Sequence, residues 1–238
     1  MGRSIISLGR GGSFFANAVT VQPHRSPPAA MFLRRLRTSA ALRRGASDGG
    51  VLAALRAELS HELASSAPSD PPPFHSQDDP DFVTVRDAPR AQDVLLRRRG
   101  DSDEVLVSAL LAPLQFADQA PLPRAALMKV FVSKPGAAPV LHFDCRTFWV
   151  GEDGGDADYA IDAVRYHPIP GDAAEGKYEG PEFRDLDPGL KAALREFLAA
   201  RGVNSKLAGS ILHHLLQKEH SQYVNWLKTL EMAFAKNH

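Results

Sequence analysis

"ALMKVFVSKPGAAPVLHFDCRTFWV", residues 126–150, is the stretch that decides the fold of this chain. Two runs rich in Val, Leu and Phe stand on either side of the short break "PGAA". Apolar, β-branched runs flanking a break that contains glycine and proline predict two antiparallel strands joined by a tight connection. In the second run Leu141, Phe143 and Cys145 alternate, so they share one face of the strand. The stretch therefore predicts the centre of an antiparallel sheet with one buried face.

Similar runs, separated by short turn segments and without any helical periodicity between them, extend to both sides of this centre. Such spacing is typical of an antiparallel meander. A single sheet of this size has two faces and two edges, and few helices remain to cover them, so we expect self-association to bury part of its surface. The predicted strands lie at residues 82–87, 93–99, 104–112, 126–134, 139–150 and 159–168, with a candidate seventh strand at 177–185.

Helical patterns flank the meander. Residues 49–66 carry leucines at three- and four-residue steps, and the segment 67–81, rich in proline and acids, follows as a linker. Asp187 and Pro188 form a helix start signal, since an N-cap acceptor precedes proline at the first helical position. Gly202 is expected to end that helix, and a second helix should run from about 205 to 235. The predicted class is α+β, with one N-terminal and two C-terminal helices beside the antiparallel sheet.

The first 47 residues contain eight arginines and no acidic residue. An arginine-rich, serine-rich and acid-free start is typical of an organelle transit peptide, and a disordered basic tail is the alternative. We favour the mitochondrion over the chloroplast because arginine outweighs serine and threonine here. We therefore predict a mitochondrial transit peptide at residues 1–47, cleaved between residues 37 and 50. Residues 48–238 would then form the α+β domain, with the linker 67–81 inside it.

The formal net charge of zero hides an acidic mature chain. Removing the eight N-terminal arginines from the 28 basic residues leaves 20 against 28 acidic residues, a net charge of −8. An acidic protein favours basic partners, and a mainly electrostatic grip on nucleic acid is disfavoured. No stretch approaches the ~20 consecutive apolar residues of a membrane-spanning helix, so no membrane span is expected.

The sequence "HHLLQKEHSQYVNW", residues 213–226, is the first candidate site, because histidine and carboxylate are ligands for transition metals. His213 and His220 are seven residues apart, about 10.5 Å along a helix, which is too far to share one ion. Glu219 points about 100° away from His220 on the same helix. We therefore expect no metal and no other cofactor, and alanine at His213 or His214 should cost little stability.

The acidic sequence "GEDGGDADY" is the second candidate. It lacks the D-x-D-x-D-G spacing of a calcium loop, so a solvated hairpin turn and a binding site for a basic ligand are both open readings. We treat it as a candidate partner-binding loop, made of Glu152, Asp153, Asp156 and Asp158.

No motif for catalysis stands out: the chain has no G-x-S-x-G elbow, phosphate loop or dinucleotide fingerprint. Cys145 is the single cysteine, so an internal disulfide is excluded, and its strand-like setting favours a buried hydrophobe over a reactive thiol. The run Arg97-Arg98-Arg99 closes a predicted strand, where it could blunt a sheet edge or contact RNA.

The C-terminal sequence "RGVNSKLAGSILHHLLQKEHSQYVNWLKTLEMAFAKN" resembles the mitochondrial glycoprotein family, also called the mitochondrial matrix acidic protein family. The resemblance covers roughly residues 50–238, and the run "VFVSKPGAAPVLHFDC" is similar to the plant branch. The matching pattern is RG(V/I) followed by E-H-x-x-Y-x-x-x-L-x-x-L, at Arg201-Gly202-Val203, Ala208, Leu212, Glu219-His220, Tyr223, Leu227, Leu230 and Phe234.

The resemblance implies a highly twisted, seven-stranded antiparallel sheet flanked by helices, and a homotrimeric ring with an acidic face. It also implies a non-enzymatic, chaperone-like or adaptor protein of the mitochondrial matrix, linked to translation, ribosome assembly and respiratory function. The 20 basic residues of the mature part depart from the most acidic members of the family.

Three functions follow from these observations. The favoured one is an oligomeric matrix protein that binds basic proteins and supports mitochondrial translation, ribosome assembly or respiratory-complex assembly. The alternatives are an RNA-binding regulator of mitochondrial gene expression and a metal-dependent enzyme that uses the histidine-rich C-terminal helix. Under the favoured function the C-terminal stripe serves packing and the oligomer interface, through Leu216, Glu219, His220, Tyr223, Trp226, Leu227, Leu230 and Phe234.

Overall fold

The structure is a computed structural model, and it describes residues 48–65, 81–118, 120–134, 137–150, 156–167 and 178–235. The predicted transit peptide, 1–47, and the predicted linker up to residue 80 lie outside the described residues. Within the described part, no helix is both long and apolar enough to cross a membrane.

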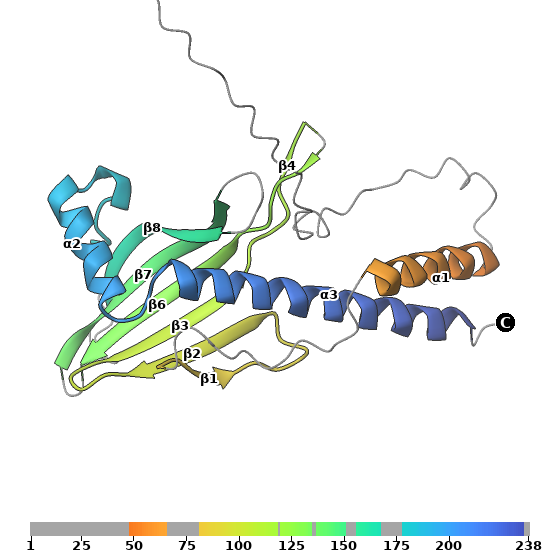
Figure 1. The fold of residues 1–238 in the computed structure, drawn as a ribbon, viewed down its shortest axis with the longest axis horizontal. Coiled ribbons are helices and arrows are strands. Elements are labelled where there is room, and N and C mark those ends of the chain that lie inside the picture. The colour runs from red at the N-terminus through yellow and green to blue at the C-terminus, as the bar shows by residue number, and fades with distance from the viewer. Residues whose placement is uncertain are drawn as a thin grey trace, which may run out of the picture.

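The predicted meander is confirmed: all paired neighbours in the main sheet are antiparallel, in the order β1-β2-β3-β6-β7-β8 (Figure 1). Two further short strands pair only with each other and form a hairpin between β3 and β6. The strand bounds are β1 Val83–Arg86, β2 Asp93–Arg99, β3 Glu104–Leu111, β4 Phe116–Ala117, β5 Ala120–Pro121, β6 Ala126–Lys134, β7 Ala137–Val150 and β8 Asp156–His167.

The candidate seventh strand at 177–185 is wrong for the described part of that segment. Residues 178–182 are irregular, and Phe183–Asp185 form a single 3-10 turn, η2. Gly180 has a positive φ of 88°, and Pro181, which follows it, has no N–H to donate to a neighbouring strand. The sheet in the described residues therefore has six strands.

One face of the sheet forms the core. Helix α3, Ser205–Ala235, lies across this face (Figure 1), and its N-terminal half buries apolar side chains in the core: Leu207, Ile211, Leu212, Leu215 and Leu216. Val130 of β6 pairs with Phe143 of β7, and both side chains are fully buried. The alternation predicted for β7 is confirmed, since Phe143 and Cys145 lie in the core while the intervening residues face the other way.

The opposite face of the sheet, which we call the open face, keeps large apolar side chains exposed. Leu110 of β3 pairs with Leu127 of β6, and both are about two-fifths exposed. Phe148 on β7 is exposed to a similar degree. Polar and charged residues stand beside them on this face, including Lys129 and Arg146, each with its side chain more than half exposed.

The helix signals read from the sequence are confirmed. Helix α2, Pro188–Ala199, begins after Asp187, whose Oδ1 accepts hydrogen bonds from the backbone N–H groups of Gly189 and Leu190 at 2.8 and 3.1 Å. Gly202 has φ 78° and ends the helical turn that follows α2. Ser205 then starts α3, and its hydroxyl donates to Asp158 of β8 at 2.8 Å.

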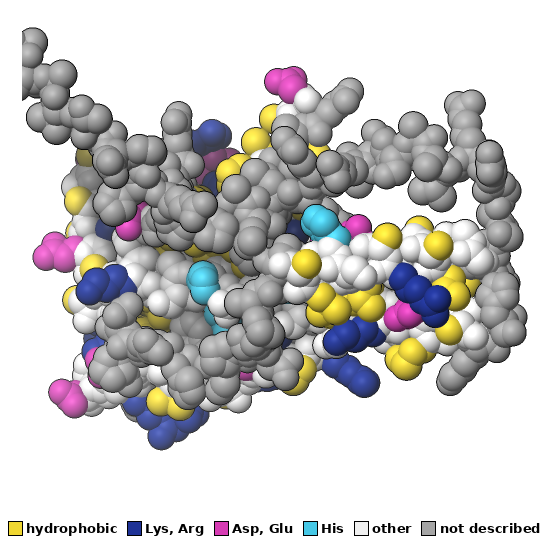
Figure 2. Space-filling model, turned by 45° about the vertical axis from the view of Figure 1, so that its right-hand side comes forward, with side chains coloured by type: hydrophobic (Ala, Val, Ile, Leu, Met, Phe, Trp, Pro, Cys, Tyr) yellow, Lys and Arg dark blue, Asp and Glu magenta, His cyan; other side chains and the backbone are white. Residues whose placement is uncertain are grey.

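The N-terminal helix α1, Asp48–Ser65, runs alongside the C-terminal half of α3, beyond the end of the sheet (Figure 1). We call this pair of helices the α1–α3 arm. None of the α1 side chains whose burial is described is fully buried. Leu63 of α1 and Trp226 and Met232 of α3 are each more than half exposed. The arm is therefore only partly covered within one chain, and Figure 2 shows hydrophobic side chains interspersed with Lys and Arg on its surface.

Candidate functional site

Polar contacts fix α1 against α3. Tyr223 Oη donates to Glu58 Oε1 at 2.9 Å, and His220 Nε2 lies 3.1 Å from Glu62 Oε2. A further ion pair joins Arg56 to Glu231 at 2.8 Å, although the exposure of Arg56 makes its contribution small. Two residues of the predicted C-terminal stripe, His220 and Tyr223, thus make contacts inside one chain.

The other members of that stripe are divided by burial into residues packed inside the chain and residues that remain at least partly exposed. Leu216 and Leu227 are buried, at 5% and 2% exposure. Leu230 and Phe234 are half-buried, Glu219 is exposed, and Trp226 is 54% exposed with its ring stacked on Tyr223. The buried group packs within the chain, and the exposed group stays a candidate for an interface.

Tyr223→Phe is expected to lower the free energy of unfolding by about 1 kcal/mol, because Glu58 loses a hydrogen-bond donor while the stacking on Trp226 remains. Urea denaturation of the variant and of the parent protein measures this difference. Thr229→Val serves as the control, since it removes a hydroxyl that bonds only back to its own helix, at Asn225. A loss no larger than in this control would contradict the role of the Glu58 contact.

A buried charged cluster, which the sequence did not reveal, fastens α3 to the connection between β1 and β2. Lys218 Nζ donates to Asp87 Oδ1 at 2.6 Å and to the carbonyl of Asp93 at 2.9 Å. His214 Nε2 lies 2.9 Å from Asp87 Oδ2. We call Asp87, His214 and Lys218 the Asp87 cluster. His214 is 7% exposed, so the expectation that alanine costs little there applies only to His213, which is exposed.

Opposing effects set the protonation of the Asp87 cluster. Burial alone would raise the pKa of Asp87, but the hydrogen bond from Lys218 and the charges of His214 and Lys218 hold it below its ordinary value. Burial lowers the pKa of His214 below its ordinary value, and the attraction of Asp87 offsets this only in part. The lowered pKa of His214 keeps its imidazole neutral at neutral pH, beside the ion pair of Asp87 with Lys218.

A second polar cluster lies on the open face, where β7 meets β8. His142 Nδ1 is 3.0 Å from His167 Nε2, and His142 Nε2 is 3.2 Å from Asp144 Oδ1. Arg165 bonds the other oxygen of Asp144 and also donates to Glu179 at 3.1 Å. We call these five residues the β7–β8 cluster.

The surroundings keep His142 neutral. Its ring stacks on Phe131 with the centroids 4.5 Å apart, and the side chain is 7% exposed. Burial, together with the positive charges of Lys129, His167 and Arg165, lowers the pKa of His142 to about 4. Nδ1 of this neutral ring shares a hydrogen bond with His167, whereas the buried Nε2 has no hydrogen-bond partner among the described residues, although Asp144 Oδ1 is 3.2 Å away.

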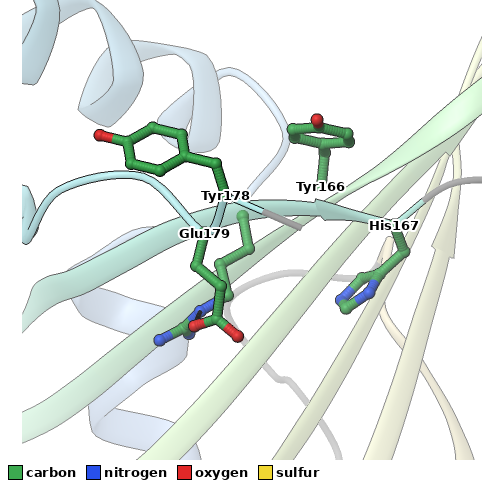
Figure 3. A pocket seen from close by; sticks show the side chains of 5 residues that line it. Tyr166, His167, Tyr178 and Glu179 are labelled. Atoms are coloured by element: carbon green, nitrogen blue, oxygen red, sulfur yellow. Dashed lines mark hydrogen bonds and ion pairs between the residues drawn. The ribbon is translucent and has the colours of Figure 1, made fainter. Parts of the chain in front are cut away.

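A shallow cavity of about 110 Å³ opens beside this cluster (Figure 3). It is lined by Arg165, Tyr166, His167, Tyr178 and Glu179. Figure 3 shows the rings of Tyr166 and Tyr178 on one side of the β8 edge, with His167 and Glu179 on the other. His167 is exposed, so the cavity connects the histidine pair to solvent.

The candidate acidic loop is described only in part. Glu152 and Asp153 lie outside the described residues. Asp156 is exposed at the start of β8, whereas Asp158 is half-buried and accepts from the Ser205 hydroxyl and its neighbour's N–H. Of the two described acids, Asp156 is therefore the exposed one.

The excess of acid is concentrated outside the described residues of the domain. The structure describes 21 of the 28 acidic residues, and it describes 18 of the 20 basic residues that follow position 47. The structured body is therefore close to charge balance. The remaining seven acids are Asp70, Asp78, Asp79, Glu152, Asp153, Asp172 and Glu175, against Lys177 and Lys236.

The structure also places the residues of the alternative functions. Arg97 lies 3.9 Å from Glu104, and Arg98 lies 3.1 Å from Asp81, so two of the three arginines have carboxylate partners. Cys145 is buried, and burial raises the pKa of its thiol to about 12, as expected for a packed hydrophobe. Over the described ranges, no three His, Cys, Asp or Glu side chains converge as a metal-binding group.

Fold and surfaces together define a class: an α+β protein whose single antiparallel sheet is covered by a long C-terminal helix on one face and left open on the other. Two solved structures share this fold. The p22 protein of Trypanosoma brucei superposes with a TM-score of 0.57 at 20% identity, covering 80% of this chain and 100% of that chain. A Leishmania major protein, described as a sequence homologue of human p32, gives 0.58 at 20% identity, with coverages of 79% and 99%.

Comparison of the sequence with known proteins finds a matching family and two mitochondrial relatives. The pattern of the family described as mitochondrial glycoprotein matches residues 119–234. An uncharacterised mitochondrial protein of Arabidopsis thaliana is 26% identical over 242 residues, covering 96% of this chain and 89% of the relative. The mitochondrial acidic protein mam33 of Schizosaccharomyces pombe is 28% identical over 105 residues, covering 42% of this chain and 38% of the relative.

The chain resembles the mitochondrial glycoprotein family over residues 119–234, just under half of its length. The resemblance read from its C-terminal helix is thereby confirmed, and the names of the family and of both relatives support the predicted mitochondrial location.

Proposed function

We propose that the protein is a non-enzymatic, homotrimeric binding protein of the mitochondrial matrix. It engages basic proteins in a chaperone-like way and supports mitochondrial translation, ribosome assembly or respiratory-complex assembly. The observation that carries the proposal is the amount of apolar surface that one chain leaves uncovered, on the open face and on the α1–α3 arm.

The uncovered surface argues for self-association. Leu110, Leu127 and Phe148 are exposed on the open face, and Trp226 and Met232 on the arm, where water would contact large apolar side chains. Extended exposed apolar patches mark contact surfaces in soluble proteins. Identical copies arranged around a rotation axis bury the same patches in each copy, so a closed ring would cover this exposed apolar surface.

The charge distribution argues for basic partners. The structured body is close to neutral, whereas the segments after residue 47 that lie outside the described residues hold seven acids and two bases. One of these segments contains Glu152 and Asp153, next to the exposed Asp156. Three copies would multiply this local negative charge, which attracts lysine- and arginine-rich chains in a salt-dependent way.

The oligomeric state is tested by light scattering on the purified protein. We expect a mass near three times that of one chain at micromolar concentration. A monomer mass at that concentration would contradict the homotrimer. Trp226→Glu, which places a charge on the exposed side of the arm, tests whether the arm takes part, and Lys228→Glu on an exposed position of the same helix is its control.

Partner binding is tested with a synthetic lysine- and arginine-rich peptide and fluorescence titration at two salt concentrations. We expect affinity to fall as salt rises, and to fall about fivefold or more when Glu152→Gln, Asp153→Asn and Asp156→Asn are combined. The control removes three exposed acids elsewhere, through Asp101→Asn, Glu182→Gln and Glu196→Gln. Equal losses in both triple variants would reject the acidic loop as the binding site, and salt-independent binding would reject the electrostatic mechanism.

A further inference from the structure

The two histidines of the β7–β8 cluster lie at a separation that suits two ligands of one metal ion. His142 Nδ1 and His167 Nε2 are 3.0 Å apart, on neighbouring antiparallel strands. Two imidazole nitrogens that bind one ion at ~2.0–2.1 Å, with an angle slightly above 90° between the bonds, are themselves about 3 Å apart. Metal bonds would replace the mutual hydrogen bond, with each ring turning so that its nitrogen lone pair points at the ion and no longer at the other ring.

The neighbours of His142 hold it in the orientation that a ligand needs. Asp144 Oδ1 lies 3.2 Å from His142 Nε2, and a ring that carries its proton on Nε2 leaves the lone pair of Nδ1 toward His167. Metal-binding histidines commonly donate their second N–H to a carboxylate, and Asp144 is the carboxylate close enough to accept it once the ring turns toward an ion. Stacking on Phe131 fixes the plane of the ring.

Access and charge are also suitable for a cation. His167 is exposed and lines the cavity of about 110 Å³ shown in Figure 3, so an ion can reach Nε2 from solvent. Two positive side chains, Lys129 and Arg165, and two negative ones, Asp144 and Glu179, surround the histidine pair, so their charges sum to zero. The site therefore neither repels nor strongly attracts a divalent ion, and its affinity depends on the two nitrogen ligands.

We propose that His142 and His167 form a two-histidine site for a divalent transition-metal ion such as Zn²⁺, with water in the remaining coordination positions. Imidazole nitrogen is a preferred ligand for zinc, nickel and copper, whereas calcium and magnesium prefer oxygen. Two protein ligands are fewer than the three or four of catalytic and structural zinc sites, so binding is reversible and weaker than in those sites. A bound ion would cross-link β8, at the edge of the sheet, to β7.

Zinc binding to the full chain, prepared without a histidine tag, is measured by isothermal titration calorimetry at pH 7.5, together with the shift in thermal midpoint. We expect zinc to bind and to raise the midpoint, since a ligand of the folded state stabilises it. His167→Gln should weaken this binding at least ~10-fold and abolish the shift. Because His167 is exposed, this variant is expected to fold even where His142→Gln does not.

Two controls separate this site from other histidines. His213→Gln removes an exposed histidine of α3, and His220→Gln removes the histidine beside Glu62 on the arm. Both should leave the calorimetric affinity and the midpoint shift unchanged. Zinc affinity and stoichiometry that are unaffected by His167→Gln, or the absence of binding at millimolar zinc, would overturn the proposal. Neither outcome bears on the trimer or on peptide binding, which are measured separately.

Discussion

Asp87→Ala is expected to lower the free energy of unfolding by about 3–5 kcal/mol, a large effect for a residue in a connection between two strands. Lys218 is 4% exposed, and Asp87 is its only carboxylate partner in the Asp87 cluster. Removing the carboxylate leaves a buried ammonium with the carbonyl of Asp93 as its remaining partner in the cluster, and His214 loses the carboxylate that lies 2.9 Å from its Nε2. A buried charge without a counter-charge costs more than the ion pair itself contributes.

Urea denaturation of the variant, monitored by circular dichroism, measures this loss. Asp101→Ala is the matched control, since it removes an exposed aspartate from another connection between strands and should change stability by less than about 0.5 kcal/mol. In the double variant Asp87→Ala/Lys218→Met, the loss in free energy of unfolding should be smaller than the sum of the losses in the two single variants. The reason is that no buried charge is then left without a counter-charge. Additive losses would show that the two side chains do not act as a pair.

Stability is also expected to fall as the pH is lowered from about 6.5, well before ordinary carboxylates are protonated. The pKa of His142 is lowered to about 4 and that of His214 is lowered as well, in both cases first by burial. Between about 6.5 and the folded-state pKa, the unfolded chain therefore binds more protons than the folded chain, so stability decreases with decreasing pH. The slope is at most about 1.4 kcal/mol per pH unit for each histidine. Asp87 adds to this loss only below about pH 3.8, because its folded-state pKa is lowered.

Urea denaturation at pH 7.5, 6.5, 5.5 and 4.5 checks this expectation, with the pH values spanning the titration range of a histidine, ~6.5 downward. His142→Gln, which keeps hydrogen-bonding groups but does not titrate, should reduce the slope between pH 6.5 and 4.5. His213→Gln at an exposed position should leave the slope as it is. A free energy of unfolding that stays constant over this range would contradict the burial of neutral histidines.

The local structure of this chain was predictable because its signals are local. Alternation in 126–150 predicted which face of β7 is buried, and Phe143 and Cys145 are indeed in the core. Asp187 and Gly202 predicted the start and the end of a helix from the backbone conformations that caps require. The prediction of a seventh strand was wrong. Gly180 has a positive φ and Pro181 has no N–H for a ladder hydrogen bond, and these two local features outweigh the apolar–polar pattern around them.

The candidate sites were harder to predict, because they depend on residues that are far apart in the chain. Asp87 and Lys218 are separated by 131 residues, and His142 and His167 by 25. The sequence placed His214 beside a packed stripe, and nothing local shows that a carboxylate from the β1–β2 connection reaches it. The histidine-rich stretch drew attention at the C-terminus, whereas a pair of histidines in direct contact lies on β7 and β8.

The sequence by itself determined the α+β class, the antiparallel meander, the helix ends and the family, since each rests on residues within a few turns or strands of one another. Only the tertiary structure decided which polar groups meet: the Asp87 cluster, the contacts of Tyr223 and His220 with α1, and the histidine pair on the open face. The physical reason is that strand register and helix packing together fix positions to within an ångström or two. Hydrogen bonds and ion pairs form only at that precision, whereas burial of an apolar face tolerates much looser placement.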